Sequence, residues 1–100
     1  MFVHVVNFWL KKSLNTEEIS FFEKEVKLLS QIKTIITFNV GVPATTDRPV
    51  IDRSYNYCLL TTFEDVAGHD FYQIAPEHLE FIKNCAHLWE KVIIYDSETI

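Results

Sequence analysis

Tyr72 and His78 are the residues whose types and spacing could do chemistry in this chain. They stand six positions apart across Pro76, and His78 then falls on the apolar stripe of an amphipathic segment, where a plain core would prefer leucine. A neutral imidazole can accept a proton at pH 7, and a tyrosine hydroxyl can donate to a developing oxyanion. Together they could act as a base and a hydrogen-bond donor on a bound ligand.

Each of these residues also has a structural interpretation. His78 could satisfy a backbone group at the start of a helix, and Tyr72 could end a short helix with its hydroxyl in water. His4 lies in an apolar strand, where a buried histidine bonded to a carbonyl or to tyrosine is the ordinary arrangement. His4 gains interest only if it meets Tyr72 or His78 in space.

Aromatic side chains are abundant, with eight Phe, four Tyr and two Trp in 100 residues. We expect some of them to form core or the wall of a small pocket that favours an apolar or aromatic ligand with a few polar atoms. The residues expected to line it are His4, Phe8, Trp9, Phe81 and Trp89.

Several kinds of site are not expected. His69, His78 and His87 lie nine residues apart, which is not a helical ligand spacing, so we predict no metal site. Cys58 and Cys85 lack a C-x-x-C spacing and fit reduced core thiols. The sequence has no glycine-rich phosphate loop, no other cofactor motif and no serine or cysteine nucleophile with an obvious base, so we expect no cofactor.

Charge and hydropathy limit the partners. The net charge is −5 and the basic residues are scattered, so nucleic acid is not an expected partner. No apolar run approaches the roughly 18 residues of a membrane span. The first residues lack the charged region and cleavage site of a signal peptide, so we expect a cytoplasmic protein without a membrane partner.

The elements that must position these residues follow from hydrophobic periodicity. One hundred residues make a single domain, 1–100. Asn15 and Glu18 have the spacing of a capping box, and Pro76 suits the first turn of a helix. We expect strands at 2–10, 34–42, 55–63 and 91–96, helices at 16–32, about 64–73 and 76–90, and a long loop at 43–54.

This order is β-α-β-β-α-β, which predicts an α+β domain of the ferredoxin-like class with a four-stranded antiparallel sheet. In this class the helices all pack on one face of the sheet. The strand at 2–10 is nevertheless apolar on both faces. Val3, Val5 and Trp9 point to one face, and the residues that share the other face with His4 are all apolar. Leaving that second face in water would expose a large apolar surface, so we expect a homodimer whose sheets enclose a barrel-like interior.

With these elements placed, the chain resembles the stress-responsive A/B barrel family, also called the dimeric α/β barrel (Dabb) family. The resemblance rests on the opening strand with His4, on the strand 55–63 ending in Phe-Glu-Asp, and on Tyr72-Gln-x-x-Pro-Glu-His78. The family commonly shows Tyr-x-x-His-Pro-x-His at this last motif, and Ala75 stands here in place of the first histidine.

The resemblance implies a homodimer with a pocket between sheet and helices in each subunit. A plant member is a polyketide cyclase that performs an aldol condensation without a cofactor, and its key tyrosine and histidine match Tyr72 and His78. A cofactor-free enzyme acting next to a carbonyl is therefore one hypothesis. A non-catalytic small-molecule-binding or stress-response protein and a cofactor-independent monooxygenase are the alternatives.

Overall fold

The computed structural model describes residues 1–100, and its centre is one antiparallel sheet. The strand order is β2-β3-β1-β4, as the ferredoxin-like class requires. All three neighbouring pairs run antiparallel, and β1 pairs with β4 along almost its whole length. The strands are β1 (Phe2–Leu10), β2 (Thr37–Gly41), β3 (Tyr57–Phe63) and β4 (Trp89–Glu98).

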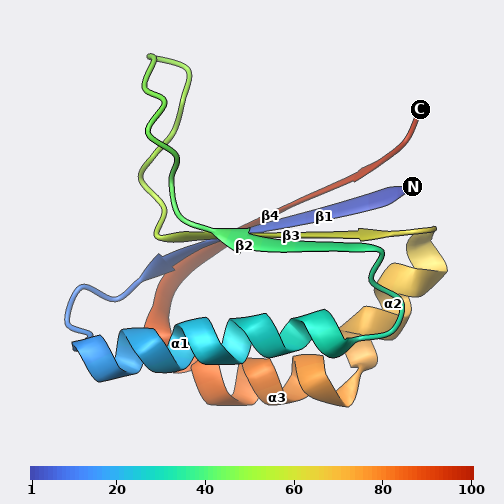
Figure 1. Cartoon of the computed structure of the whole chain (residues 1–100), viewed down its shortest axis with the longest axis horizontal. Helices are drawn as coiled ribbons and strands as arrows, with labels where there is room; N and C mark the ends of the chain where they lie inside the picture. Colours follow the sequence, from blue (N-terminus) through green and yellow to red (C-terminus); the bar gives the residue numbers. More distant parts are fainter.

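Three α-helices lie on one side of this sheet (Figure 1). They are α1 (Thr16–Leu28), α2 (Val66–Ile74) and α3 (Pro76–Cys85), and short 3₁₀ turns follow α1 and α3 at η1 (Leu29–Gln31) and η2 (Ala86–Leu88). The predicted capping box is present: Asn15 accepts from the Glu18 amide at 2.8 Å, and Glu18 accepts from the Asn15 amide at 3.0 Å. Pro76 begins α3, where its missing amide hydrogen is not needed.

The core lies between the sheet and the helices. Along β1, alternate residues from Phe2 to Leu10 are buried, and the residues between them are only half-buried. Phe22 and Val26 of α1 and Phe81 and Cys85 of α3 close the core from the other side. The pKa of the Cys85 thiol is raised to about 12, mainly because the thiol is buried. This residue is therefore an inert core thiol.

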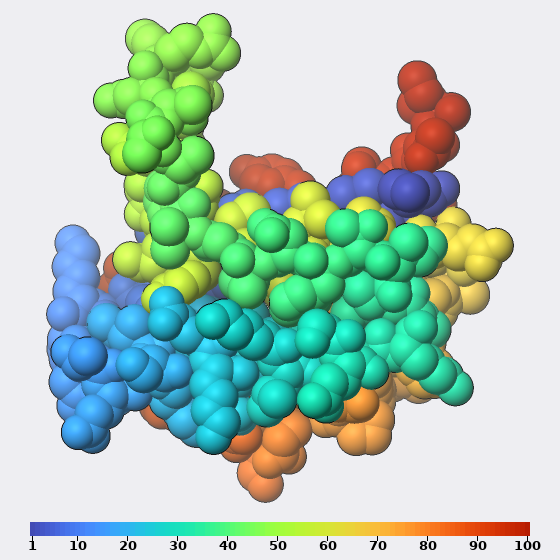
Figure 2. All heavy atoms as spheres, in the orientation of Figure 1, coloured from blue at the N-terminus to red at the C-terminus, as the bar shows by residue number.

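The second face of the sheet has no cover within the chain. Val3, Val5 and Trp9 of β1 are half-buried there, beside Leu60 and the free Cys58 of β3. Cys58 was expected in the core, but strand alternation turns it to this outer face instead. The segment 42–56, which we call the arm, rises from the sheet away from the helices and stands clear of the body (Figures 1 and 2).

Several element boundaries differ from the sequence prediction: the first helix ends at Leu28, the third strand begins at Tyr57, and the fourth strand is longer than 91–96 at both ends. Two further differences have a clear physical cause. The helix expected at 76–90 ends at Cys85, because Trp89 already pairs with Leu10 and the Lys11 amide donates to the Leu88 carbonyl at 2.9 Å. Strand pairing therefore overrides a helical pattern that continues through Trp89. The second strand begins at Thr37 rather than residue 34, because Ile35 is held in a turn by its bond to the Ile32 carbonyl.

Candidate functional site

Three elements bring three polar side chains together. His4 projects from β1 toward the helices, Tyr72 lies in the last turn of α2, and His78 lies in the first turn of α3. The ring centroids of Tyr72 and His78 are 4.8 Å apart, and those of His4 and Tyr72 are 5.6 Å apart. The helix is interrupted at Ala75-Pro76, and α3 therefore folds back beside α2. This turn places Tyr72 and His78 next to each other.

These side chains line a hollow of about 160 Å³ between sheet and helices. Its wall is mostly apolar, as a site for an apolar ligand requires. The residues predicted to line the pocket are all present except Trp9. The lining residues are His4, Val6, Phe8, Leu59, Tyr72, Gln73, His78, Phe81, Ile82, Trp89, Val92 and Ile94.

Trp9 is a correction to the predicted pocket. Successive strand residues point to opposite faces, so Trp9 lies on the outer face of the sheet while Phe8 faces the helices. Its indole nitrogen donates to Ser54 at the base of the arm over 3.1 Å, and Lys91 lies 4.6 Å from its ring centroid. Trp9 lines a separate, wider and more open hollow of about 510 Å³ there.

The His78 ring has a defined orientation. Its Nδ1 lies 3.1 Å from the backbone carbonyl of Gln73. A carbonyl oxygen only accepts, so Nδ1 carries the hydrogen and Nε2 of the neutral ring holds the free lone pair. Burial is the largest influence on His78 and lowers its pKa, although the hydrogen bond to Gln73 acts in the opposite direction. The ring is therefore neutral at pH 7. This is the form of imidazole that can accept a proton.

The Tyr72 hydroxyl is a free donor. The tyrosine is 1% exposed, yet its hydroxyl makes no hydrogen bond within the chain. Every fully occluded side-chain polar atom of the structure has a partner, so this hydroxyl keeps contact with the pocket space. Burial raises the pKa of Tyr72, and the group therefore acts as a hydrogen-bond donor rather than as a phenolate.

His4 is paired with a residue that the sequence analysis did not single out. Asp96 of β4 lies directly opposite His4 in the strand register, and its carboxylate accepts from Nδ1 of His4 at 2.5 Å. Burial is the largest influence on His4 and lowers its pKa, although Asp96 opposes the shift. His4 thus has a hydrogen-bond partner, but this partner is an aspartate and not the carbonyl or tyrosine that was expected. The His4 ring also lies beside Tyr72.

His69 is the second residue that the sequence analysis missed. Its ring stacks on Phe2 at 4.5 Å and lies 4.9 Å from the His4 ring. The intervals of nine from His69 to His78 and from His78 to His87 do not indicate a shared site. The informative spacing was His69 to Tyr72, because residues three apart share one helix face. His87 is exposed, as expected for the polar face of its segment.

The sheet order and the helical cover define an α+β domain of the ferredoxin-like class, with a pocket of aromatic and imidazole groups beneath the sheet. Residues 2–99 match the model of the Stress Responsive A/B Barrel Domain, and the chain therefore belongs to the stress-responsive A/B barrel (Dabb) family. No curated protein sequence matches it. None of its helices has the length and apolar character to cross a membrane.

Solved structures share this fold over nearly the whole chain. A Dabb family protein with a ferredoxin-like fold from Mesorhizobium loti is 26% identical, with 99% of this chain and 96% of that chain covered and a TM-score of 0.80. A dimeric protein of unknown function from Bacteroides fragilis is 25% identical, with coverages of 98% and 95% and a TM-score of 0.74. A hydroxynitrile lyase from Passiflora edulis is 23% identical, with coverages of 99% and 95% and a TM-score of 0.78.

Proposed function

We propose that the chain is a cofactor-free enzyme that acts next to a carbonyl group of a small apolar substrate, as in an aldol closure. His78 is the general base and Tyr72 is the hydrogen-bond donor. The observation that carries this proposal is the free Nε2 of a neutral imidazole beside an unpartnered tyrosine hydroxyl, both at one apolar hollow.

The reaction needs no group beyond these two. Nε2 of His78 takes a proton from the carbon next to the substrate carbonyl, and the electron pair of the broken C–H bond moves to the carbonyl oxygen. The Tyr72 hydroxyl donates to the enolate oxygen. The enolate carbon then forms a bond to a second carbonyl carbon, and the alkoxide formed there receives the proton back from His78.

The hydroxynitrile lyase among the similar structures is consistent with this class of chemistry. Cleavage of a hydroxynitrile breaks a carbon–carbon bond at a carbon that becomes a carbonyl, with loss of the hydroxyl proton to a base. An aldol closure forms such a bond in the reverse sense. The likeness lies in the fold alone, so the reaction and the substrate of this chain are both to be found by assay.

We also propose that the working form is a homodimer joined through the outer face of the sheet. Several similar structures are described as dimeric, and the outer face of this chain is apolar and uncovered. The arm rises on that side, in the position to lie against a second copy (Figure 2). In this arrangement the arm meets the second copy and does not cover the pocket, because the pocket lies on the opposite side of the sheet (Figure 1).

The proposed activity is tested on a panel of aryl β-polyketones and aromatic cyanohydrins. His78→Gln is expected to lower turnover by about 10²-fold or more, the usual contribution of a general base, while affinity changes only a few-fold. Tyr72→Phe removes the donor and keeps the ring, and it is expected to lower turnover as well. Turnover by His78→Gln equal to that of the unmodified protein would show that His78 is not the base.

Occupancy of the pocket is tested separately. Val92 lines the hollow and is 38% exposed, so Val92→Trp can fill the space without straining the core. We expect this variant to lose ligand binding, and Val66→Trp at an exposed position on α2 serves as the matched control. Binding without turnover above buffer on the whole panel would favour the non-catalytic binding protein instead.

A further inference from the structure

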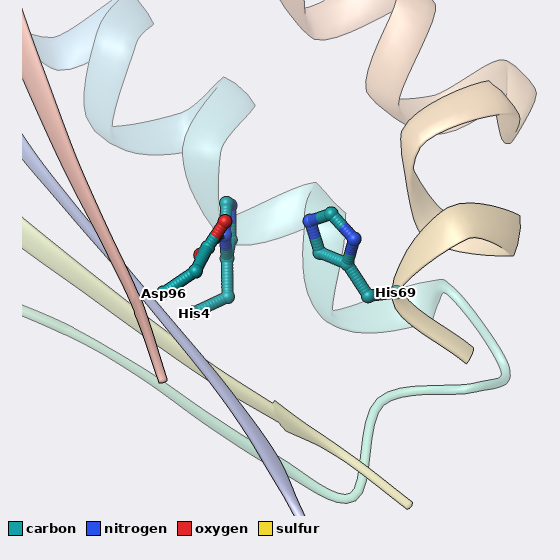
Figure 3. Close-up of side chains that lie close together, drawn as sticks. All are labelled: His4, His69 and Asp96. Carbon is teal, nitrogen blue, oxygen red and sulfur yellow. Dashed lines mark hydrogen bonds and ion pairs between the residues drawn. The ribbon is translucent and has the colours of Figure 1, made fainter. Parts of the chain in front are cut away.

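We propose that His4, His69 and Asp96 form a three-ligand site for a divalent transition-metal ion of the zinc class. The three side chains come from β1, α2 and β4, and their candidate ligand atoms all lie within 4.8 Å of one another. Figure 3 shows His69 directed from its helix toward the pair that His4 and Asp96 form across the two strands.

The spacing needs only a small adjustment to enclose an ion. Ligand atoms about 2.0–2.2 Å from a tetrahedral zinc ion lie about 3.4 Å from one another. His4 and Asp96 are joined at 2.5 Å, so an ion taking the place of the shared hydrogen would move these two atoms apart slightly. The His69 ring must also move toward the ion. Its present polar contacts are long, at 3.4 Å from Nδ1 to the Asp70 carboxylate and 3.2 Å from Nε2 to the Gln73 amide nitrogen.

The ligand types select the class of ion. Two imidazoles and one carboxylate suit zinc, iron, cobalt or nickel, whereas magnesium and calcium favour sites made of oxygen atoms. Asp96 supplies the negative charge that offsets part of the charge of the ion.

The candidate site is open to solvent on one side, and neighbouring rings hold one of its ligands. The His4 side chain is 3% exposed and forms the back of the site, while Asp96 is 38% exposed and admits an ion from solvent. Phe2 stacks on the His69 ring and Phe63 meets it edge-on at 5.8 Å, so the ring is already oriented before an ion binds. Three protein ligands leave a coordination position open for water or another small ligand.

This site extends beyond the proposed function and does not depend on it. His69 and Asp96 are not among the residues that line the apolar pocket, and the chemistry assigned to His78 and Tyr72 requires no ion. The two proposals share only His4. The test therefore measures ion binding directly and uses no turnover.

The experiment titrates the untagged, full-length protein with Co²⁺, followed by visible absorption, and with Zn²⁺, followed by calorimetry. We expect one ion per protomer and the absorption bands of low-coordinate Co²⁺. His69→Gln and Asp96→Asn should each weaken affinity tenfold or more. His87→Gln removes an exposed imidazole off the cluster, and it should leave affinity within twofold of the unmodified protein.

Far-UV circular dichroism and the mass in solution show that each variant is folded. Two results would overturn the proposal. One is no saturable binding by the folded, unmodified protein. The other is binding that survives His69→Gln and Asp96→Asn, or that falls equally in His87→Gln, because the ion then lies elsewhere on the surface.

Discussion

His78 donates from Nδ1 to the backbone carbonyl of Gln73 over 3.1 Å, across the break between α2 and α3. The bond spans five residues and ties the first turn of α3 to the end of α2. One nitrogen is thereby used for orientation, and the other is left for the pocket. The local, structural interpretation of His78 and the chemical one are both satisfied, because an imidazole has two distinct nitrogens.

The tautomer of His78 follows from this bond. We expect the neutral ring to carry its hydrogen on Nδ1 at pH 7.5, because a carbonyl oxygen cannot donate. Long-range proton–nitrogen correlation spectra of labelled protein distinguish the two tautomers, and His78→Gln assigns the signal. The exposed His87 serves as an internal reference for a solvated ring. A hydrogen on Nε2 of His78 would contradict the proposed base.

The free energy of unfolding should fall as the pH falls from 7.5 to 5.5. Burial lowers the pKa of both His4 and His78 below the ordinary 6.5, so near and below pH 6.5 the unfolded chain takes up protons that the folded chain does not. Stability therefore rises with pH across this window, by at most about 1.4 kcal/mol per pH unit for each histidine. The contribution is fully present above pH 6.5 and is lost on the way down to the lowered pKa.

Chemical unfolding at fixed protein concentration measures this slope, because a dimer gains stability with concentration. His78→Gln should reduce the slope, since one of the two groups no longer titrates. Carboxylates titrate mainly below pH 5 and lie outside the window. An unfolding free energy that is flat or rises toward pH 5.5 would contradict the prediction.

Val5→Lys should convert the protein to a monomer. Val5 is half-buried on the outer face of the sheet, and a lysine there would place a charge inside the proposed interface. Light scattering at micromolar concentration gives the mass. Ile36→Lys, at a residue 60% exposed just before β2, is the control and should keep the dimer mass. A monomer mass for the unmodified protein would refute the interface.

Asn15→Ala should lower the free energy of unfolding by about 1 kcal/mol, the usual effect of losing an N-cap. The variant removes the side-chain bond to the Glu18 amide and keeps the reciprocal bond, which the backbone amide of residue 15 donates to Glu18. Ser20→Ala, at an exposed position within α1, should change stability by less than about 0.5 kcal/mol. Equal effects of the two substitutions would show that the capping box contributes nothing measurable.

The candidate site was only partly predictable. Tyr72 and His78 are close in sequence, and a helix break between them forces their rings together, so their proximity follows from local structure. The exclusion of Trp9 from the pocket was also available, because the alternation of β1 assigns Trp9 and Phe8 to opposite faces.

The sequence by itself determined the order of strands and helices, the apolar character of both sheet faces and the Tyr72–His78 pair. Each of these depends on the period of side chains along one element or on a few neighbouring residues. The meeting of His4 with Asp96 was decided only in the tertiary structure. Their contact spans 92 positions and requires the register of β1 against β4, where a shift of one residue would turn Asp96 to the other face. His69 joins them only because α2 packs over that end of the sheet, and no local pattern specifies how a helix docks.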